Sequence, residues 1–189
     1  MAILNKSLSL HEVASIVSTT LEEAGISAVL TGGAAVSIYT DNLYQSYDLD
    51  FISPENNKKL EDALRPLGFS HRPGYKDFTC PDTDFSIEFP GRALVLGDMV
   101  LPLEDTNTLE TPFGILRVVT PTQSIIDRMA AYVYWKDPQS QDQALLIAQK
   151  NEIDWTTLYS WAASEGIKRS IIDDLKSSSE NLRDQHAER

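Results

Sequence analysis

The sequence is poor in residues that form covalent cross-links or bind soft metals. Its 189 residues include a single cysteine, Cys80, and three histidines, His11, His71 and His186, without metal-ligand spacing. One cysteine excludes an intramolecular disulfide and a cysteine zinc cluster. Any metal ion that the chain binds is therefore expected to be held by oxygen ligands.

Long apolar runs are also missing. The chain has no run of about 18 apolar residues, the length of a membrane span, and residues 1–15 lack both a signal-peptide core and a small-residue cleavage site. The sequence thus predicts no membrane segment and a cytoplasmic location. Because 42% of its residues are hydrophobic, the chain can still bury a sizeable core.

Positive charge is scarce relative to negative charge. Sixteen Lys and Arg residues stand against 28 Asp and Glu residues, which leaves a formal net charge of -12. This charge repels a polyphosphate backbone at long range and argues against non-specific nucleic-acid binding. A local basic path, a site for divalent cations and a surface for a basic partner all stay compatible with the composition.

The apolar pattern divides the chain into two unlike parts. Short apolar runs alternate with helical patterns up to residue 119, whereas the pattern is helical from Pro121 onward. This predicts an α+β region over residues 1–119 and a C-terminal helical region over residues 120–189. Strands are predicted at 27–31, 47–52, 69–72, 75–79, 84–89 and in a hairpin over 108–119. Helices are predicted at 9–25, 33–39, 53–68, 120–136, 138–150, 154–166 and from 167 onward.

Local signals predict where the early helices begin and end. Ser9 with Glu12 forms a capping box. Ser53 is expected to cap the next helix, with Pro54 at its first position, and Gly68 to end it.

The strand over residues 47–52 carries two aspartates on one face. Side chains alternate along a strand, so Asp48 and Asp50 point to one side and the residues between them to the other. Two carboxylates this close raise each other's pKa unless a cation neutralises them. Oxygen ligands suit Mg²⁺ or Mn²⁺, the ions that escort nucleotide phosphates. The alternative interpretation is an edge strand protected by charge.

A glycine pair precedes this strand, in the sequence LTGGAAV. A strand ends at Thr31, and Gly32 and Gly33 open a helix whose free N–H groups can face an anion. The pattern predicts a phosphate cradle. No Lys follows, as in a Walker loop, and the third glycine of the dinucleotide fingerprint is missing.

A third carboxylate is expected from the strand DFSIEF. Asp84, Ser86 and Glu88 share one face of this strand. Glu88 lies mid-strand between apolar residues, whereas Asp84 follows a turn signal and is explained as a solvated turn residue. Glu88 is therefore the predicted third metal ligand.

Together these motifs resemble the polymerase β type nucleotidyltransferase superfamily. Its signature is an apolar residue, Gly, then Gly or Ser, an Asp-apolar-Asp strand, and a later strand with a third carboxylate. Here these are residues 30–33, Asp48, Asp50 and Glu88. The resemblance implies a mixed sheet flanked by helices, and a Mg²⁺- or Mn²⁺-dependent transfer of a nucleoside monophosphate from an NTP.

Residues 120–148 are similar to the helical segment that follows the catalytic domain in the AbiEii-like branch, the abortive-infection toxins of type IV toxin-antitoxin systems. The residues of this segment that match those near the nucleotide are Asp127, Arg128, Trp135, Lys136 and Asp137. The resemblance implies that Arg128 and Lys136 contact the nucleotide. A surface Asp127–Arg128 pair and a lysine that ends a helix favourably are the alternatives.

Gly33 departs from the family pattern, because many members have Ser at this position. The departure removes a hydroxyl that could contact phosphate, and Ser37, one helical turn on, is predicted to replace it.

The resemblance places an RNA 3′ end, such as that of tRNA, first among acceptors, with a protein hydroxyl second and an aminoglycoside-like molecule third. Residues 70–78, SHRPGYKDF, predict a hairpin, with a guide for an RNA end as the alternative. The polar tail over 171–189 is a solvated helix or a segment ordered by a partner such as an antitoxin. A non-catalytic nucleotide- or partner-binding module with the same fold is the alternative function.

Overall fold

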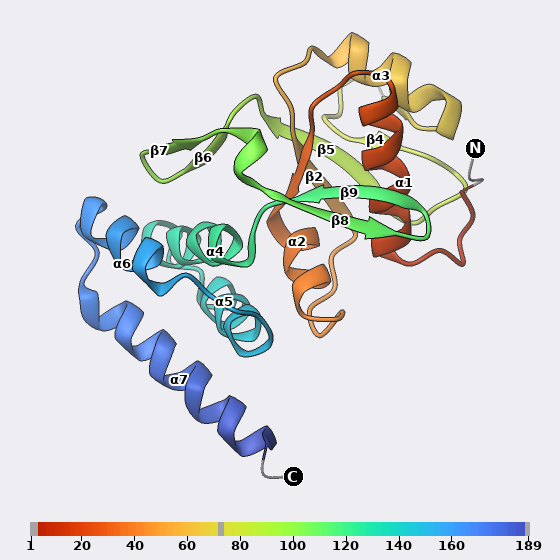
Figure 1. Ribbon diagram of the computed structural model, residues 1–189. Helices are drawn as coiled ribbons and strands as arrows, with labels where there is room; N and C mark the ends of the chain where they lie inside the picture. Colours follow the sequence, from red (N-terminus) through yellow and green to blue (C-terminus); the bar gives the residue numbers. More distant parts are fainter. Residues whose placement is uncertain (1–3, 72–73, 188–189) are drawn as a thin grey trace.

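The computed structural model of the protein describes residues 4–71 and 74–187, with side chains up to residue 183 (Figure 1). The α-helices are α1 (Leu10–Glu23), α2 (Gly32–Tyr39), α3 (Asn57–Leu64), α4 (Pro121–Trp135), α5 (Pro138–Lys150), α6 (Trp155–Ser164) and α7 (Arg169–Ala187). The strands are β1 (Val29–Thr31), β2 (Asp48–Ile52), β3 (Ser70–His71), β4 (Phe78–Thr79), β5 (Ser86–Gly91), β6 (Leu94–Leu96), β7 (Met99–Leu101), β8 (Asn107–Thr111) and β9 (Gly114–Val118). Short 3₁₀ turns lie at Arg65–Leu67 and Leu103–Asp105.

Seven strands form a mixed sheet in the order β3-β4-β5-β2-β1-β9-β8. Strand β2 runs parallel to β5 and antiparallel to β1, and β1 runs parallel to β9. Helices flank this sheet, and the bundle α4–α7 lies to one side of it (Figure 1). The predicted α+β class, with a mixed sheet flanked by helices and a C-terminal helical region, is confirmed.

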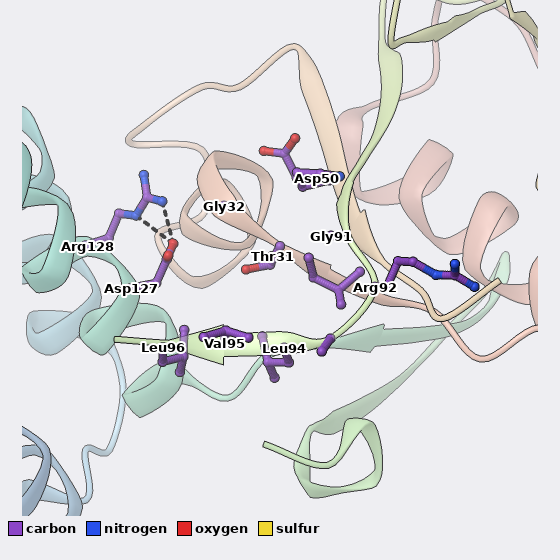
Figure 2. A pocket seen from close by; sticks show the side chains of 13 residues that line it. Thr31, Gly32, Asp50, Gly91, Arg92, Leu94, Val95, Leu96, Asp127 and Arg128 are labelled. Carbon is purple, nitrogen blue, oxygen red and sulfur yellow. Dashed lines mark hydrogen bonds and ion pairs between the residues drawn. The ribbon is translucent and has the colours of Figure 1, made fainter. Parts of the chain in front are cut away.

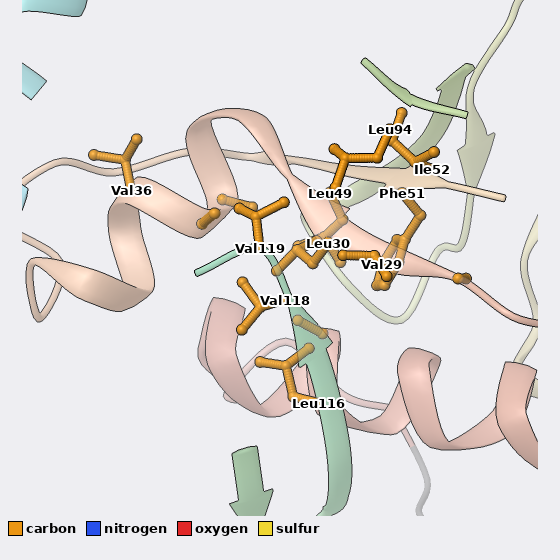
Figure 3. Close-up of a cluster of buried hydrophobic side chains, with 14 of the residues drawn as sticks. Val29, Leu30, Val36, Leu49, Phe51, Ile52, Leu94, Leu116, Val118 and Val119 are labelled. Atoms are coloured by element: carbon orange, nitrogen blue, oxygen red, sulfur yellow. The ribbon is translucent and has the colours of Figure 1, made fainter. Parts of the chain in front are cut away.

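The hydrophobic core explains the register of β2. Leu49 and Phe51 are fully buried in the same cluster as Leu30 of the neighbouring β1 and Val118 of β9 (Figure 3). A slip of one residue would turn both aspartates into this core and expose the two apolar side chains. Burial of each large apolar side chain contributes roughly 1.5–3 kcal/mol, so the alternation firmly directs Asp48 and Asp50 to the opposite face.

The capping predictions are confirmed for the first helix and partly wrong for α3. Ser9 and Glu12 form the predicted capping box. Asn56, not Ser53, caps α3, because its side chain accepts a hydrogen bond of 3.0 Å from the Lys59 N–H. The Ser53 hydroxyl is used elsewhere and donates to the Ser27 carbonyl at 2.7 Å. The predicted terminator Gly68 ends the following 3₁₀ turn in the left-handed conformation, at φ +90°.

The helical region is fastened to the sheet domain through α2. The Asn151 side-chain amide donates to the Tyr39 carbonyl at 2.9 Å, and the Tyr39 hydroxyl donates to the carbonyl of Val119, just before the helical region begins, at 2.6 Å. Lys150 forms an ion pair of 2.7 Å with Asp41. Buried apolar side chains of the two regions also belong to one continuous hydrophobic core.

The C-terminal tail forms the helix α7, which packs along α5. Ile172 and Leu175 are buried, and Arg183 donates to the carbonyls of Ala148 and Asn151. The tail is thus ordered by the chain itself and is less solvated than its composition predicts. Within the described ranges, no helix is long and apolar enough to cross a membrane.

Two hairpins flank β5. Strands β3 and β4 pair antiparallel, which confirms the hairpin predicted over residues 70–78, although Arg72 lies outside the described residues. The second hairpin, β6–β7, was not predicted. Its sequence signal is nonetheless present, because Gly97 and Asp98 separate two short apolar runs, a spacing typical of a two-residue turn.

Candidate functional site

The parallel pairing of β2 and β5 places the predicted carboxylates on one face of the sheet. Asp48 is the register partner of Ser86, and Asp50 is the partner of Glu88. Paired residues of neighbouring strands present their side chains on the same face of a sheet. Asp48, Asp50 and Glu88 therefore share one face, as the sequence predicts.

Asp50 has an unfavourable environment for its charge. Burial, and after it the negative charges of Glu88 and Asp48, raise the pKa of Asp50 to about 6. Asp127 also raises this pKa, whereas the Arg128 guanidinium lowers it. Partly buried carboxylates that repel one another form a site that a cation would stabilise.

Asp48 is more exposed than Asp50 and has a local partner. Its carboxylate accepts a hydrogen bond of 2.6 Å from the Ser86 hydroxyl. The Ser46 hydroxyl donates to the Asp48 carbonyl at 3.0 Å, and this bond orders the chain just before β2. Asp84, the carboxylate that was rejected as a ligand, instead forms an exposed ion pair with Lys6 at 3.0 Å.

Gly32 lies directly against Asp50 at the start of α2 (Figure 2). A Cβ atom on Gly32 would come within 2.4 Å of an Asp50 carboxylate oxygen, and the residue has φ +61°. Both facts require glycine at this position. The Thr31 side chain does not cap the helix, so it does not occupy the first N–H groups of α2. The positive dipole end of the helix lies at Gly32, beside the Asp50 carboxylate.

Ser37 does not join the predicted phosphate cradle. Its side chain is fully buried, and its hydroxyl donates to the Gly33 carbonyl at 3.2 Å and accepts from the Ser46 N–H at 3.0 Å. The hydroxyl therefore ties the loop before β2 to helix α2. Gly33 packs against the same loop, since a Cβ there would lie 3.2 Å from the Ser46 hydroxyl.

A cavity of about 650 Å³ opens at the face that carries Asp50 (Figure 2). One side is formed by Asp50, Gly32 and the α4 residues Asp127 and Arg128. The remaining lining residues come from the ends of β1 and β2 and from the chain that leads from β5 into β6: Thr31, Ile52, Pro90, Gly91, Arg92, Ala93, Leu94, Val95 and Leu96. The cavity thus has a charged side and a largely apolar wall.

Asp127 and Arg128 reach this cavity as a fixed pair. The Arg128 guanidinium donates through Nε to the Asp127 carboxylate at 3.1 Å, and also through Nη2. Its Nη1 donates to the Gln143 side chain of α5 at 3.3 Å. The structure therefore brings Arg128, but not the whole predicted set, to the carboxylates.

Lys136 and Trp135 lie apart from the cavity, at the end of α4. Lys136 stands eight residues beyond Arg128, which is about 12 Å along a helix, and its ammonium group donates to the Val133 carbonyl at 3.1 Å. It occupies the left-handed C-cap position of the helix. Trp135 is 82% exposed and lies outside the hydrophobic core.

The carboxylate oxygens of Asp48, Asp50 and Glu88 are of the chemical type that a hard divalent cation binds. Three carboxylates share one face, and the raised pKa of Asp50 reflects burial and, after it, the negative charges of its neighbours. Across the part of the chain that the structure describes, no three His, Cys, Asp or Glu side chains are already gathered closely enough to hold an ion. The hydrogen bond from Ser86 is the contact that Asp48 would have to exchange for a metal ion.

The fold and these residues form one arrangement: a mixed sheet, an Asp-Leu-Asp strand paired with a glutamate strand, and a glycine at a helix start beside them.

Comparison with solved structures shows that the fold occurs in another protein. The chain is similar to an antigenic nucleotidyltransferase-like protein from Paracoccidioides brasiliensis, with a TM-score of 0.58 and 17% identity over 94% of each chain. It is also matched to the antibiotic-resistance factor ANT(2'')-Ia, in solution and in complex with adenylyl-2''-tobramycin, at TM-scores of 0.45 and 0.47. The identities are 14% and 13%, over 95% and 92% of this chain and 97% of each ANT(2'')-Ia chain. At such TM-scores the ANT(2'')-Ia matches support no conclusion about this chain. No protein-family model matches the sequence, and no curated protein matches it.

Proposed function

We propose that this protein transfers a nucleoside monophosphate from an NTP to an acceptor hydroxyl. The observation that carries the proposal is the parallel register of β2 and β5, which places Asp50 beside Glu88 and both on the face where α2 begins. Gly32 adjoins Asp50 there, and the cavity is large enough for a nucleotide. These features meet the needs of a triphosphate: cation ligands, backbone donors and space.

Asp48, Asp50 and Glu88 would hold Mg²⁺ or Mn²⁺, and such ions, when bound, offset the charge of the triphosphate and lower the pKa of the attacking hydroxyl. The acceptor oxygen forms a bond to the α-phosphorus while the bond to the β-phosphate oxygen breaks, and pyrophosphate leaves. The N–H groups at the start of α2 meet the charge of the leaving group, and Arg128 adds a positive charge at the cavity. The proton of the acceptor hydroxyl leaves towards the Glu88 carboxylate.

The acceptor in this proposal is an RNA 3′ end, such as that of tRNA, and the protein acts as a toxin that a cognate antitoxin restrains. The support is the resemblance of residues 120–148 to the AbiEii-like helical segment, together with the position of Arg128 at the cavity. The net charge of -12 requires that RNA binding depend on a local contact set. Binding should then weaken steeply as salt is added.

A non-catalytic nucleotide-binding module is the second candidate, and one observation favours it. The Asp48 carboxylate is engaged by Ser86, and the three carboxylates are not closely gathered. Mg²⁺-dependent NTP binding without turnover would identify such a module.

The test is incubation of the purified protein with total cellular RNA, Mg²⁺ and each α-labelled NTP in turn. A variant with Asp48→Ala and Asp50→Ala serves as the inactive comparison. Asp84→Ala is the matched control, because Asp84 lies just before β5 but is exposed and paired with Lys6. Label in an RNA band with the wild type and the control alone supports the proposal. Equal labelling by the double variant contradicts it.

A further inference from the structure

The tip of the β6–β7 hairpin is held by a carboxylate from the helical region. Glu165 follows α6 and accepts a hydrogen bond of 2.7 Å from the Asp98 N–H at the hairpin turn. Its second oxygen accepts from the hydroxyl of Tyr134, near the end of α4. Glu165 therefore joins three elements that are distant in sequence.

The contact at the tip is close and needs a specific backbone. Gly97 adopts φ +65°, and a Cβ atom there would lie 2.2 Å from a Glu165 oxygen. The glycine thus allows the carboxylate to approach the turn.

Strand β6 of the hairpin that Glu165 holds is also part of the apolar wall of the cavity. Leu94 and Leu96 point inward and are each 2% exposed, whereas Val95 and its cross-strand partner Val100 are 51% and 66% exposed. Isolated two-stranded hairpins are marginally stable, so contacts outside the ribbon must hold this one in place. Its inner leucines and the Glu165 contact at its tip provide them.

The distribution of charged and apolar residues around the cavity matches that of a nucleoside triphosphate, which has a charged end and a ring system at the other end. Asp50, Gly32 and Arg128 form the charged side of the cavity, and β6 contributes Val95, which is exposed, and the buried Leu94 and Leu96 to its apolar wall. A triphosphate placed at the charged side leaves the flat nucleobase, whose two faces are apolar, to meet the wall.

We propose that Glu165 is a positioning residue that holds the β6–β7 hairpin as the nucleobase-binding wall. This inference rests on the proposed function and extends it to the part of the nucleotide that the carboxylates do not contact. Glu165 acts through the hairpin and does not touch the reacting atoms. Its loss should weaken nucleotide binding and leave the chemical step largely unchanged.

The variants separate the two hydrogen bonds. Glu165→Ala removes both, and Tyr134→Phe removes the bond to the hydroxyl alone. Glu165→Gln keeps an oxygen that can accept from the Asp98 N–H, so it is the conservative variant expected to restore binding. Glu152→Ala is the matched control, because Glu152 is an exposed glutamate next to Asn151, before α6 begins.

The measurements are the dissociation constant for each Mg²⁺–NTP, the split between KM and kcat, and amide hydrogen exchange over residues 94–101. Glu165→Ala should raise KM and the dissociation constant roughly fivefold to tenfold, which corresponds to about 1–1.4 kcal/mol, with kcat within about twofold. Exchange in the hairpin should accelerate in the same variant and return towards wild type in Glu165→Gln.

The two proposals fail in different ways. NTP binding and exchange that are the same in Glu165→Ala as in the wild type would overturn the positioning role alone. A wild type that binds no NTP, together with faster hairpin exchange in Glu165→Ala, would instead refute the proposed function. A drop in kcat with unchanged KM would also contradict the inference, because it would place Glu165 in the chemical step.

Discussion

Asp50 combines partial burial with three neighbouring acidic groups, and this makes its charge costly. Its pKa of about 6 in the folded protein lies above the ordinary value of 3.8. The folded state therefore retains a proton that the unfolded chain has released between these two pH values. Below pH 3.8 the Asp50 carboxyl is protonated in both states and does not lower the free energy of unfolding. Its ionisation lowers that free energy as the pH rises from 3.8 to about 6, and the loss stays constant above that.

Asp50→Asn should therefore stabilise the metal-free protein at pH 8. After allowance for partial exposure to solvent, the gain is about 1–2 kcal/mol in the free energy of unfolding, or roughly 2–8 °C in Tm. The gain should vanish near pH 4, where the wild-type carboxyl is protonated. Thermal unfolding in excess chelator at both pH values measures it, with Asp84→Asn as the control. A variant that is less stable than the wild type at pH 8 would contradict this account.

At the residue scale, the sequence was informative where local geometry decides the outcome. Strand alternation was enough to place Asp48 and Asp50 on one face, and the structure adds Glu88 through the β2–β5 register. Ser37 was misassigned because its hydroxyl is captured by the Ser46 N–H, nine residues away, after the loop folds back. The role of Glu165 depends on Asp98, 67 residues away, and no local pattern indicates it.

At the scale of single elements, the start of α2 is determined by contact and by backbone conformation together. Gly32 meets the Asp50 carboxylate, whereas Gly25, after α1, has φ +69° and open space around its Cβ position. Substitution of the two glycines can therefore separate two contributions to the free energy of unfolding, the strain of a left-handed backbone and the steric overlap of a Cβ atom.

Gly32→Ala should abolish transfer activity and lower the free energy of unfolding by about 2–4 kcal/mol, because steric overlap adds to backbone strain. Gly25→Ala carries the strain alone and should cost about 1 kcal/mol with activity retained. Chemical denaturation and the labelling assay measure both effects. Equal losses in the two variants would show that the contact with Asp50 contributes nothing.

Element boundaries were predicted best where a cap is local. The Ser9 capping box and the helix at 138–150 are confirmed. The α3 start was wrong because Ser53 and Asn56 are both good caps, and a tertiary bond to Ser27 decided between them. The β6–β7 hairpin was missed because its strands are only three residues long, although its Gly-Asp turn was visible.

At the scale of the whole molecule, the division of the chain into a domain of residues 1–119 and a helical region of residues 120–189 stays a prediction. The junction itself is tightly bonded, since Tyr39 of α2 donates to Val119 and accepts from the Asn107 side chain at 3.1 Å. Burial raises the pKa of Tyr39 to about 12, so this hydroxyl keeps its proton throughout the physiological range.

The shared core predicts a single cooperative unfolding transition. All three tryptophans, Trp135, Trp155 and Trp161, lie in the helical region, so their fluorescence reports on that region alone. Far-ultraviolet circular dichroism reports on the sheet and helices together. The two denaturation curves should coincide, with midpoints equal within error. An earlier fluorescence transition would show that the helical region unfolds independently.

The close approach of Gly32 to Asp50 also has an evolutionary consequence. In a library with every amino acid at position 32, glycine alone should survive selection for activity, because any Cβ meets the carboxylate. Val95 of the β6–β7 hairpin, which is exposed and lines the cavity, carries no such constraint. Substitutions that change ligand preference would therefore be found on the hairpin in related proteins, whereas Gly32 and Asp50 would be conserved.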